Sequence, residues 1–137
     1  MNQKAVRWKQ RFTNLKKALT LLTEAVSGEA LNRLEQEGLI QRFEYSFELA
    51  WETMKDFLES RGVDAVFPRD VIKAGFSTGL LANGELWLEM LEGKNRLSHT
   101  YNEETFLFAV RKIRQEYFPQ LILLESRLTE ELEQLDG

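Results

Sequence analysis

Apolar side chains recur at intervals of three and four residues along almost the whole chain, and this spacing restricts the fold more than any other feature. Residues three or four apart share one face of an α-helix, whereas a half-buried strand alternates apolar and polar residues with a period of two. The sequence does not keep such an alternation anywhere. The clearest helical stripe consists of Trp8, Phe12, Leu15, Leu19, Leu22 and Val26. The pattern therefore predicts an all-α protein.

Glycine, proline and capping residues divide the first half of the chain into three helices. The first helix is expected to end near residues 27–28. The second ends near residues 61–62, and Gly38 weakens its early turns because glycine costs about 1 kcal/mol relative to alanine inside a helix. Pro68 occupies the first position of a short third helix, which ends near Gly79.

Two further helices follow the short one. Asn83 is expected to cap the fourth helix, which frays at Gly93, and residues 102–104 cap and charge a long last helix. Pro119 lies inside this last helix, where it should remove one backbone hydrogen bond and produce a kink. We therefore expect one domain over residues 1–137, an antiparallel up-and-down bundle of four main helices plus one short helix.

The composition excludes several classes of function. The 137 residues are 43% hydrophobic and 29% charged, with a net charge of −4. This balance argues against a binder of duplex DNA, which needs a basic face, but leaves room for a small local RNA site. The chain has no cysteine and one histidine, so we expect neither disulfides nor a metal site. No stretch reaches the roughly 20 apolar residues of a membrane span, so we expect a cytoplasmic protein.

The one histidine, His99, lies in the segment Lys94–Tyr101, which follows a glycine between two predicted helices. Histidine can donate or accept a proton near neutral pH, and the cations beside it are suited to holding a phosphate. One interpretation is therefore a phosphate-binding, proton-transferring site. The alternative is structural, with Asn95 and His99 capping helix ends while Lys94 and Arg96 stay solvated. The spacing alone does not separate the two.

Glu44, Glu48 and Glu52 recur every four residues and therefore share one face of the second helix. Three like charges in a row repel one another unless cations approach. A functional interpretation pairs them with basic residues near the segment Lys94–Tyr101 or with a basic partner. The alternative, which we prefer on the sequence alone, is a solvated face beside Lys55.

Two sets of apolar side chains also have two interpretations. Tyr45, Phe47 and Trp51 could form a surface for stacking bases, but aromatic residues at this spacing on an amphipathic helix are expected in the core. Residues 106–108 and 121–124 are apolar on more than one face of the last helix. A bundle core needs one stripe, so we expect the extra face to form a homodimer.

Four blocks of sequence, in this order, resemble the nucleotidyltransferase substrate-binding protein family. They are residues 41–51 (Gln-Arg-Phe-Glu-Tyr-Ser-Phe-Glu-Leu-Ala-Trp), 68–72 (Pro-Arg-Asp-Val-Ile), 84–91 (Gly-Glu-Leu-Trp-Leu-Glu-Met-Leu) and 98–101 (Ser-His-Thr-Tyr). The resemblance covers about residues 8–135. It implies a helical bundle like the KNTase C-terminal domain and HEPN proteins, which pairs with a separate minimal nucleotidyltransferase.

This family is similar to the HEPN superfamily and to the HepT partner of the MntA nucleotidyltransferase, and the similarity implies residue roles. In those proteins an Arg, a polar residue and a His form an RNase motif, and a Tyr two residues after the His accepts AMP. The polar residue here is Asn95, the His is His99 and the Tyr is Tyr101. Lys94 stands in the position of the Arg and lacks its bidentate fork, and Gly93 stands where an acidic residue is usual.

The preferred function that the resemblance implies is a non-catalytic substrate-binding or regulatory subunit of a minimal nucleotidyltransferase. It would act as a homodimer within a heterotetramer, and a toxin–antitoxin pair is one setting for it. No cofactor is expected in this chain, because nucleotide and Mg²⁺ would be bound by the partner. The residues expected to contact substrate or partner are Asn95, Arg96, Tyr101, Glu44 and Glu48.

Two alternatives remain open. One is a metal-independent RNase toxin of HEPN type, in which His99 is the acid or base, Lys94 binds phosphate, and Tyr101 is modified with AMP by the partner. The other is a structural adaptor in which the motif only caps helices. The toxin predicts RNA cleavage that is lost in His99→Ala, whereas the subunit predicts no cleavage by this chain alone.

Overall fold

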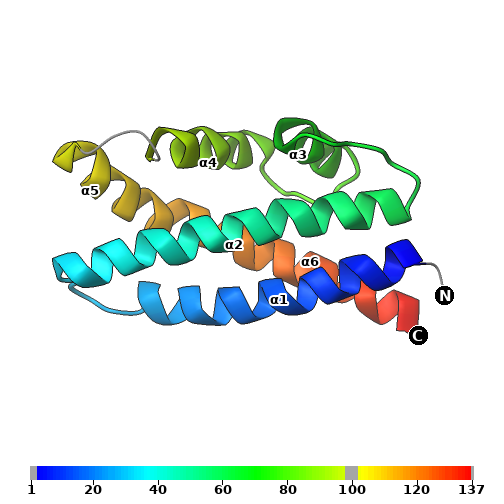
Figure 1. Cartoon of the computed structure of the whole chain (residues 1–137), viewed down its shortest axis with the longest axis horizontal. Helices are drawn as coiled ribbons and strands as arrows, with labels where there is room; N and C mark the ends of the chain where they lie inside the picture. Colours follow the sequence, from blue (N-terminus) through cyan, green and yellow to red (C-terminus); the bar gives the residue numbers. More distant parts are fainter. Residues whose placement is uncertain (1–2, 98–101, 137) are drawn as a thin grey trace.

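The computed structural model describes residues 3–97 and 102–136, and within them it contains helices and connecting turns but no strand (Figure 1). The elements are α1 (Gln3–Val26), α2 (Arg33–Ser60), α3 (Pro68–Ser77), α4 (Gly84–Leu97), α5 (Glu103–Lys112), the π-helical segment η1 (Ile113–Tyr117) and α6 (Phe118–Asp136). Because α5, η1 and α6 follow one another without a break, they form one long rod. Four long rods and the short α3 confirm the predicted all-α bundle.

The longest helix pair is α1 and α2, which lie side by side and run in opposite directions (Figure 1). The predicted stripe of α1 is buried, from Trp8 at 0% exposure to Leu22 at 0%. Full burial of a large apolar side chain contributes about 1.5–3 kcal/mol relative to its exposure, so this stripe anchors the bundle.

A capping box starts α2 at Arg33, which is earlier than Gly38 alone would suggest. The backbone N–H of Glu35 donates to Asn32 Oδ1 at 2.8 Å, and the backbone N–H of Asn32 donates to Glu35 Oε1 at 2.9 Å. Both donors would otherwise lack partners at the helix end. Leu34 is 77% exposed, so it does not belong to the buried stripe of this helix.

The predicted starts of α3 and α4 are confirmed, but the predicted end of α4 is wrong. Pro68 is the first residue of α3, and Asn83 Oδ1 accepts a hydrogen bond from the backbone N–H of Leu86 at 3.1 Å. The helix does not fray at Gly93 but continues to Leu97. A β-carbon at Gly93 would lie 3.7 Å from the hydroxyl oxygen of Tyr117, so this glycine marks where α4 packs against η1.

The last rod begins as predicted, and a π-helical turn interrupts it before Pro119. Asn102 Oδ1 accepts a hydrogen bond from the backbone N–H of Thr105 at 3.1 Å and so caps α5. Directly before Pro119, the backbone N–H of Phe118 donates to the carbonyl of Ile113, five residues back. The interruption caused by Pro119 is therefore accommodated by a π-helical turn on its N-terminal side.

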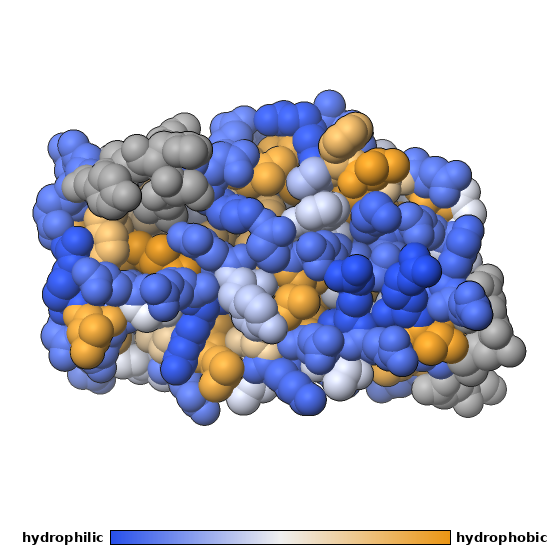
Figure 2. Space-filling view, viewed as in Figure 1, coloured by the Kyte–Doolittle hydropathy of each residue, from blue (hydrophilic) through white to orange (hydrophobic). Residues whose placement is uncertain are grey.

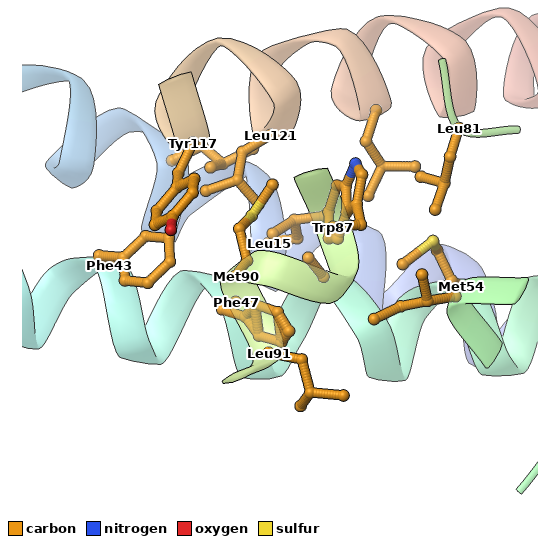
Figure 3. Close-up of a cluster of buried hydrophobic side chains, with 14 of the residues drawn as sticks. Leu15, Phe43, Phe47, Met54, Leu81, Trp87, Met90, Leu91, Tyr117 and Leu121 are labelled. Carbon is orange, nitrogen blue, oxygen red and sulfur yellow. The ribbon is translucent and has the colours of Figure 1, made fainter. Parts of the chain in front are cut away.

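The core positions α4 and η1 against α2. Phe43 of α2 stacks on Tyr117 of η1, with ring centroids 5.6 Å apart and planes at 25°, and Phe47 lies 6.0 Å from Trp87 of α4. Figure 3 shows these rings in one continuous cluster between the helices. Such pairs add to the apolar burial and fix where α4 and η1 lie.

Part of the second apolar face predicted for the last helix is exposed at the surface. Leu121 and Leu124 are buried, whereas Leu123 is 50% exposed and Phe108 is 48% exposed. Figure 2 shows a mainly hydrophilic face with separate hydrophobic patches. The homodimer remains a prediction. Within the described residues, none of the helices combines the length and apolar character needed to cross a bilayer.

Candidate functional site

Only part of the predicted motif, residues 94–101, lies within the residues that the structure describes. Lys94 and Asn95 lie in the last turns of α4, where Lys94 is partly buried and Asn95 is exposed. The backbone of Arg96 also belongs to α4, but its side chain is outside the described part. His99 and Tyr101 lie outside the described residues, so their predicted roles stay predictions.

The acidic row of Glu44, Glu48 and Glu52 on α2 faces cations from two other helices. Lys94 Nζ of α4 is ion-paired with Glu48 Oε1. Arg11 Nη1 of α1 lies 2.5 Å from Glu52 Oε2. Burial raises the pKa of the half-buried Glu44 carboxyl, and the charge of Lys94 opposes this rise. The row therefore joins α2 to α1 and to α4.

The preferred interpretation of this row as a solvated face beside Lys55 is wrong. Lys55 Nζ pairs instead with Glu59 Oε1 at 2.7 Å, one turn further along the same helix. Glu48 pairs with Lys94 of the motif, as the functional interpretation expected. Glu52 pairs instead with Arg11 of α1, which lies outside the motif. The sequence placed the three carboxylates on one face but did not reveal which cations meet them.

The three aromatic residues beside the acidic row differ in their surroundings. Phe47 is fully buried, as predicted for a core residue. Trp51 is partly buried against the core, and its Nε1 donates a hydrogen bond to Glu48 Oε2 at 2.9 Å. Tyr45 is 59% exposed, so the expectation that it belongs to the core is wrong.

A second polar cluster, which the sequence analysis missed, joins α4 to η1. The hydroxyl of Tyr117 donates to Glu89 Oε2 at 2.8 Å, and Lys112 Nζ lies 2.8 Å from the same oxygen and 2.6 Å from Glu116 Oε2. Hydrogen bonds from Lys112 and then Tyr117 lower the pKa of Glu89. Hydrogen bonds to Glu116 and Glu89 raise the pKa of Lys112. The four-residue spacing of Lys112 and Glu116 could have predicted their ion pair. Nothing in the sequence indicated the contact with Glu89.

A cavity of about 280 Å³ lies between α2, α4 and the α5–η1 rod. Glu89 and Gly93 of α4 line one side, Phe108 of α5 lines another, and Phe43 and Tyr117 line the rest of the apolar wall. Single π-helical turns occur often at functional sites, and η1 contributes directly to this wall. The arrangement offers a largely apolar space lined by two carboxylates, those of Glu89 and Glu92.

Both polar clusters consist of paired charges. Glu48 has a lysine and an indole N–H, and Glu89 has a lysine and a phenol. In the part of the chain that the structure describes, groups of three or more His, Cys, Asp or Glu side chains suited to a metal ion were not found.

Comparison with known proteins gives consistent matches. A family model described as nucleotidyltransferase substrate binding protein like matches residues 10–130. The chain is 27% identical over 94 residues to the probable ribonuclease HepT of Haemophilus influenzae. That match covers 65% of this chain and 64% of the relative, so it spans slightly less than two thirds of the relative's length.

Two solved structures share the fold. A crystal structure of a Thermus thermophilus protein matches with a TM-score of 0.73 and 30% identity, over 86% of this chain and 98% of that protein. A Haemophilus influenzae structure, described as revealing the fold of a substrate-binding domain of a nucleotidyltransferase, matches with a TM-score of 0.65 and 21% identity. It covers 89% of this chain and 96% of that one. Because the family model spans most of the chain and the bundle agrees with it, this protein belongs to the nucleotidyltransferase substrate-binding protein family.

Proposed function

We propose that this chain is a binding subunit that pairs with a separate minimal nucleotidyltransferase and helps to present its substrate. Nucleotide and Mg²⁺ belong to the partner in this proposal, and the chain acts in the cytoplasm as a homodimer within a heterotetramer. Family membership over residues 10–130 supports the pairing with a nucleotidyltransferase. The end of α4, with its neighbouring cavity, supplies the contact surface.

The observation that carries a binding role is the ion pair between Lys94 and Glu48. An RNase of the alternative type needs a cation at this position that is available to a phosphate. Lys94 instead has its charge offset by a carboxylate of α2 and lies near Glu44, which favours a recognition role for this surface. A lysine also lacks the planar fork with which arginine binds a phosphate in two places.

The second candidate function is a HEPN-type RNase toxin whose Tyr101 is modified with AMP. It is favoured by one specific observation, the similarity to a probable ribonuclease, HepT. In this proposal His99 acts as acid or base and Lys94 contacts the phosphate.

Pairing is tested by co-expressing the full chain with a minimal nucleotidyltransferase from the same genome and measuring the mass of the purified complex by light scattering. We expect a stable complex that contains both chains. Glu44→Lys should weaken it at least tenfold, because it inverts a charge at the proposed surface. Glu133→Lys makes the same change at an exposed position of α6 and serves as the control. Loss of binding in both variants, or in neither, would contradict this surface.

The two candidate functions are separated by RNA cleavage and growth arrest with this chain alone, comparing the wild type with His99→Ala. The binding subunit predicts no cleavage by either protein. Cleavage by the wild type that disappears in His99→Ala would establish the RNase instead. Lys94→Arg provides a second check, because restoring the arginine fork should increase cleavage by an RNase and leave a binding subunit inactive.

A further inference from the structure

The arginines of this chain fall into two groups. Most of the described arginine side chains lie within 4.0 Å of a carboxylate oxygen. These paired arginines are Arg7, Arg11, Arg33, Arg42, Arg61, Arg69 and Arg127. Among the described residues, Arg111 and Arg114 have no such carboxylate, although the chain carries a net charge of −4. Arg111 and Arg114, which lie about one helical turn apart, are therefore exceptions among the arginines. Their lack of a carboxylate partner needs an explanation.

Both of these arginines line the same cavity, which has a volume of about 670 Å³. It lies where the end of α1 and the beginning of α2 approach the α5–η1 rod, at the end of the bundle where α5 begins (Figure 1). Gln36 and Gln115 contribute side-chain amides, and Leu107 and Phe118 contribute apolar walls. The residues that line it include no Asp or Glu. The cavity is thus locally basic on an acidic protein.

Support of the protein fold explains only part of this arrangement. Arg114 Nη2 donates hydrogen bonds to the carbonyl oxygens of Val26, at 3.5 Å, and Gly28, and so satisfies the end of α1. A guanidinium has five N–H donors, so those on the other nitrogens of Arg114 can still bind an acceptor. Arg111 makes no comparable contact among the described residues; its guanidinium carbon lies 5.8 Å from the centroid of the Phe108 ring.

The helix dipole does not explain Arg111 either. Cations stabilise the last turn of a helix because the final carbonyl groups there lack partners. The rod continues beyond Arg111 through η1 into α6, and the cap of α5 hydrogen-bonds within the same rod. The carbonyl groups around Arg111 are therefore not those of a free helix end.

We propose that Arg111 and Arg114 form a binding site for a phosphate ester of mononucleotide size. Two guanidinium groups match the geometry and charge of a phosphate, and the amides of Gln36 and Gln115 can bind its polar substituents. Leu107 and Phe118 then contact an apolar or aromatic body. A volume of about 670 Å³ falls within the range of small-molecule sites. This inference stands apart from the proposed function, because the site needs no partner protein.

Binding is measured with AMP, inorganic phosphate and adenosine on the full chain, by calorimetry and by amide chemical shifts in two-dimensional NMR spectra. We expect AMP to bind more tightly than either fragment. We also expect the shifted amides to lie around residues 23–27 and 111–118. Higher salt should weaken the binding of AMP and leave any weak binding of adenosine unchanged.

The decisive variant is Arg111→Gln, which removes one exposed charge from the cavity without touching the contacts of Arg114. It should weaken AMP binding about tenfold, as expected for the loss of one hydrogen bond to a charged group. Arg7→Gln makes the same change at an exposed arginine on α1 that lies 4.0 Å from Glu59, and it should leave the affinity unchanged. Equal affinity of Arg111→Gln and the wild type, shifts confined to other residues, or no binding of AMP would overturn the proposal. Binding of an acidic peptide in place of AMP would overturn it as well.

Discussion

Replacing Tyr117 with phenylalanine should remove its hydrogen bond to Glu89 and leave the core packing in place. The ring of Tyr117 is stacked on Phe43, and its hydroxyl donates to Glu89 Oε2 at 2.8 Å. A hydrogen bond to a charged group contributes about 1.5–3 kcal/mol. The Glu89 side chain is 46% exposed, so water can replace the lost donor, and the expected loss in the free energy of unfolding falls to about 1 kcal/mol. For a chain of this size that corresponds to a decrease in Tm of about 3–5 °C.

The loss should depend on pH, because the acceptor is a titrating carboxylate. Lys112 and then Tyr117 lower the pKa of Glu89 below its ordinary value of 4.5. A carboxyl group with a lowered pKa in the folded state contributes stability above its unfolded pKa, and this contribution is lost as the pH falls through the folded pKa. The difference between the wild type and Tyr117→Phe should therefore be full near pH 7 and shrink as the pH falls below the ordinary pKa of Glu89.

The assay is urea unfolding followed by tryptophan fluorescence between pH 7 and the lowest pH at which both proteins still unfold cooperatively. Tyr45→Phe is the matched control, because it makes the same chemical change at a side chain that is 59% exposed. We expect its effect to stay within about 0.5 kcal/mol. An equal loss in both variants, or a loss in Tyr117→Phe that does not change with pH, would refute the reasoning.

Three further changes test the core, a cap and the acidic row. Phe47→Ala should lower the free energy of unfolding by about 3–5 kcal/mol in urea, whereas Leu34→Ala, at an exposed position, should change it by less than about 0.5 kcal/mol. Asn32→Ala removes the capping box of α2 and should cost about 1 kcal/mol, measured in the same way. Because burial raises the pKa of Glu44, its ionised form is disfavoured, and Glu44→Gln should leave the protein as stable or slightly more stable at pH 7. That difference should vanish in acid, and a carboxyl titration of Glu44 by NMR below the ordinary range would contradict it.

Local signals in the sequence were sufficient to predict the order and the approximate bounds of most helices. The stripe of α1 is buried as its spacing predicts, and Asn83 and Asn102 cap the helices that follow them. These features depend on residues three or four apart, which interact within one turn. Pro68 likewise opens α3 through its own backbone geometry.

Features that depend on contacts between helices could not be predicted in the same way. Gly93 carries the local signal of a helix end, yet it lies inside α4 where that helix meets Tyr117. The acidic row was visible in the sequence, but Lys94 reaches Glu48 only because α4 packs on α2. The contact between Glu89 and Lys112 is of the same kind, since it joins residues on different helices.

The π-helical turn before Pro119 has a consequence for how the last rod could change in evolution. A π turn holds one residue more than the α-helical ladder needs, so η1 behaves as a tolerated insertion. Deleting one residue within Ile113–Tyr117 would therefore leave α6 in its present orientation against α5, whereas deleting Gln120 in the regular helix would rotate the rest of α6 by about 100°. In the second case Leu121, Leu124 and Leu128, now buried, would be carried away from α1, while the side chains of α5 stayed in place. The π turn is therefore the place in the rod where a change of one residue in chain length leaves the two halves in register.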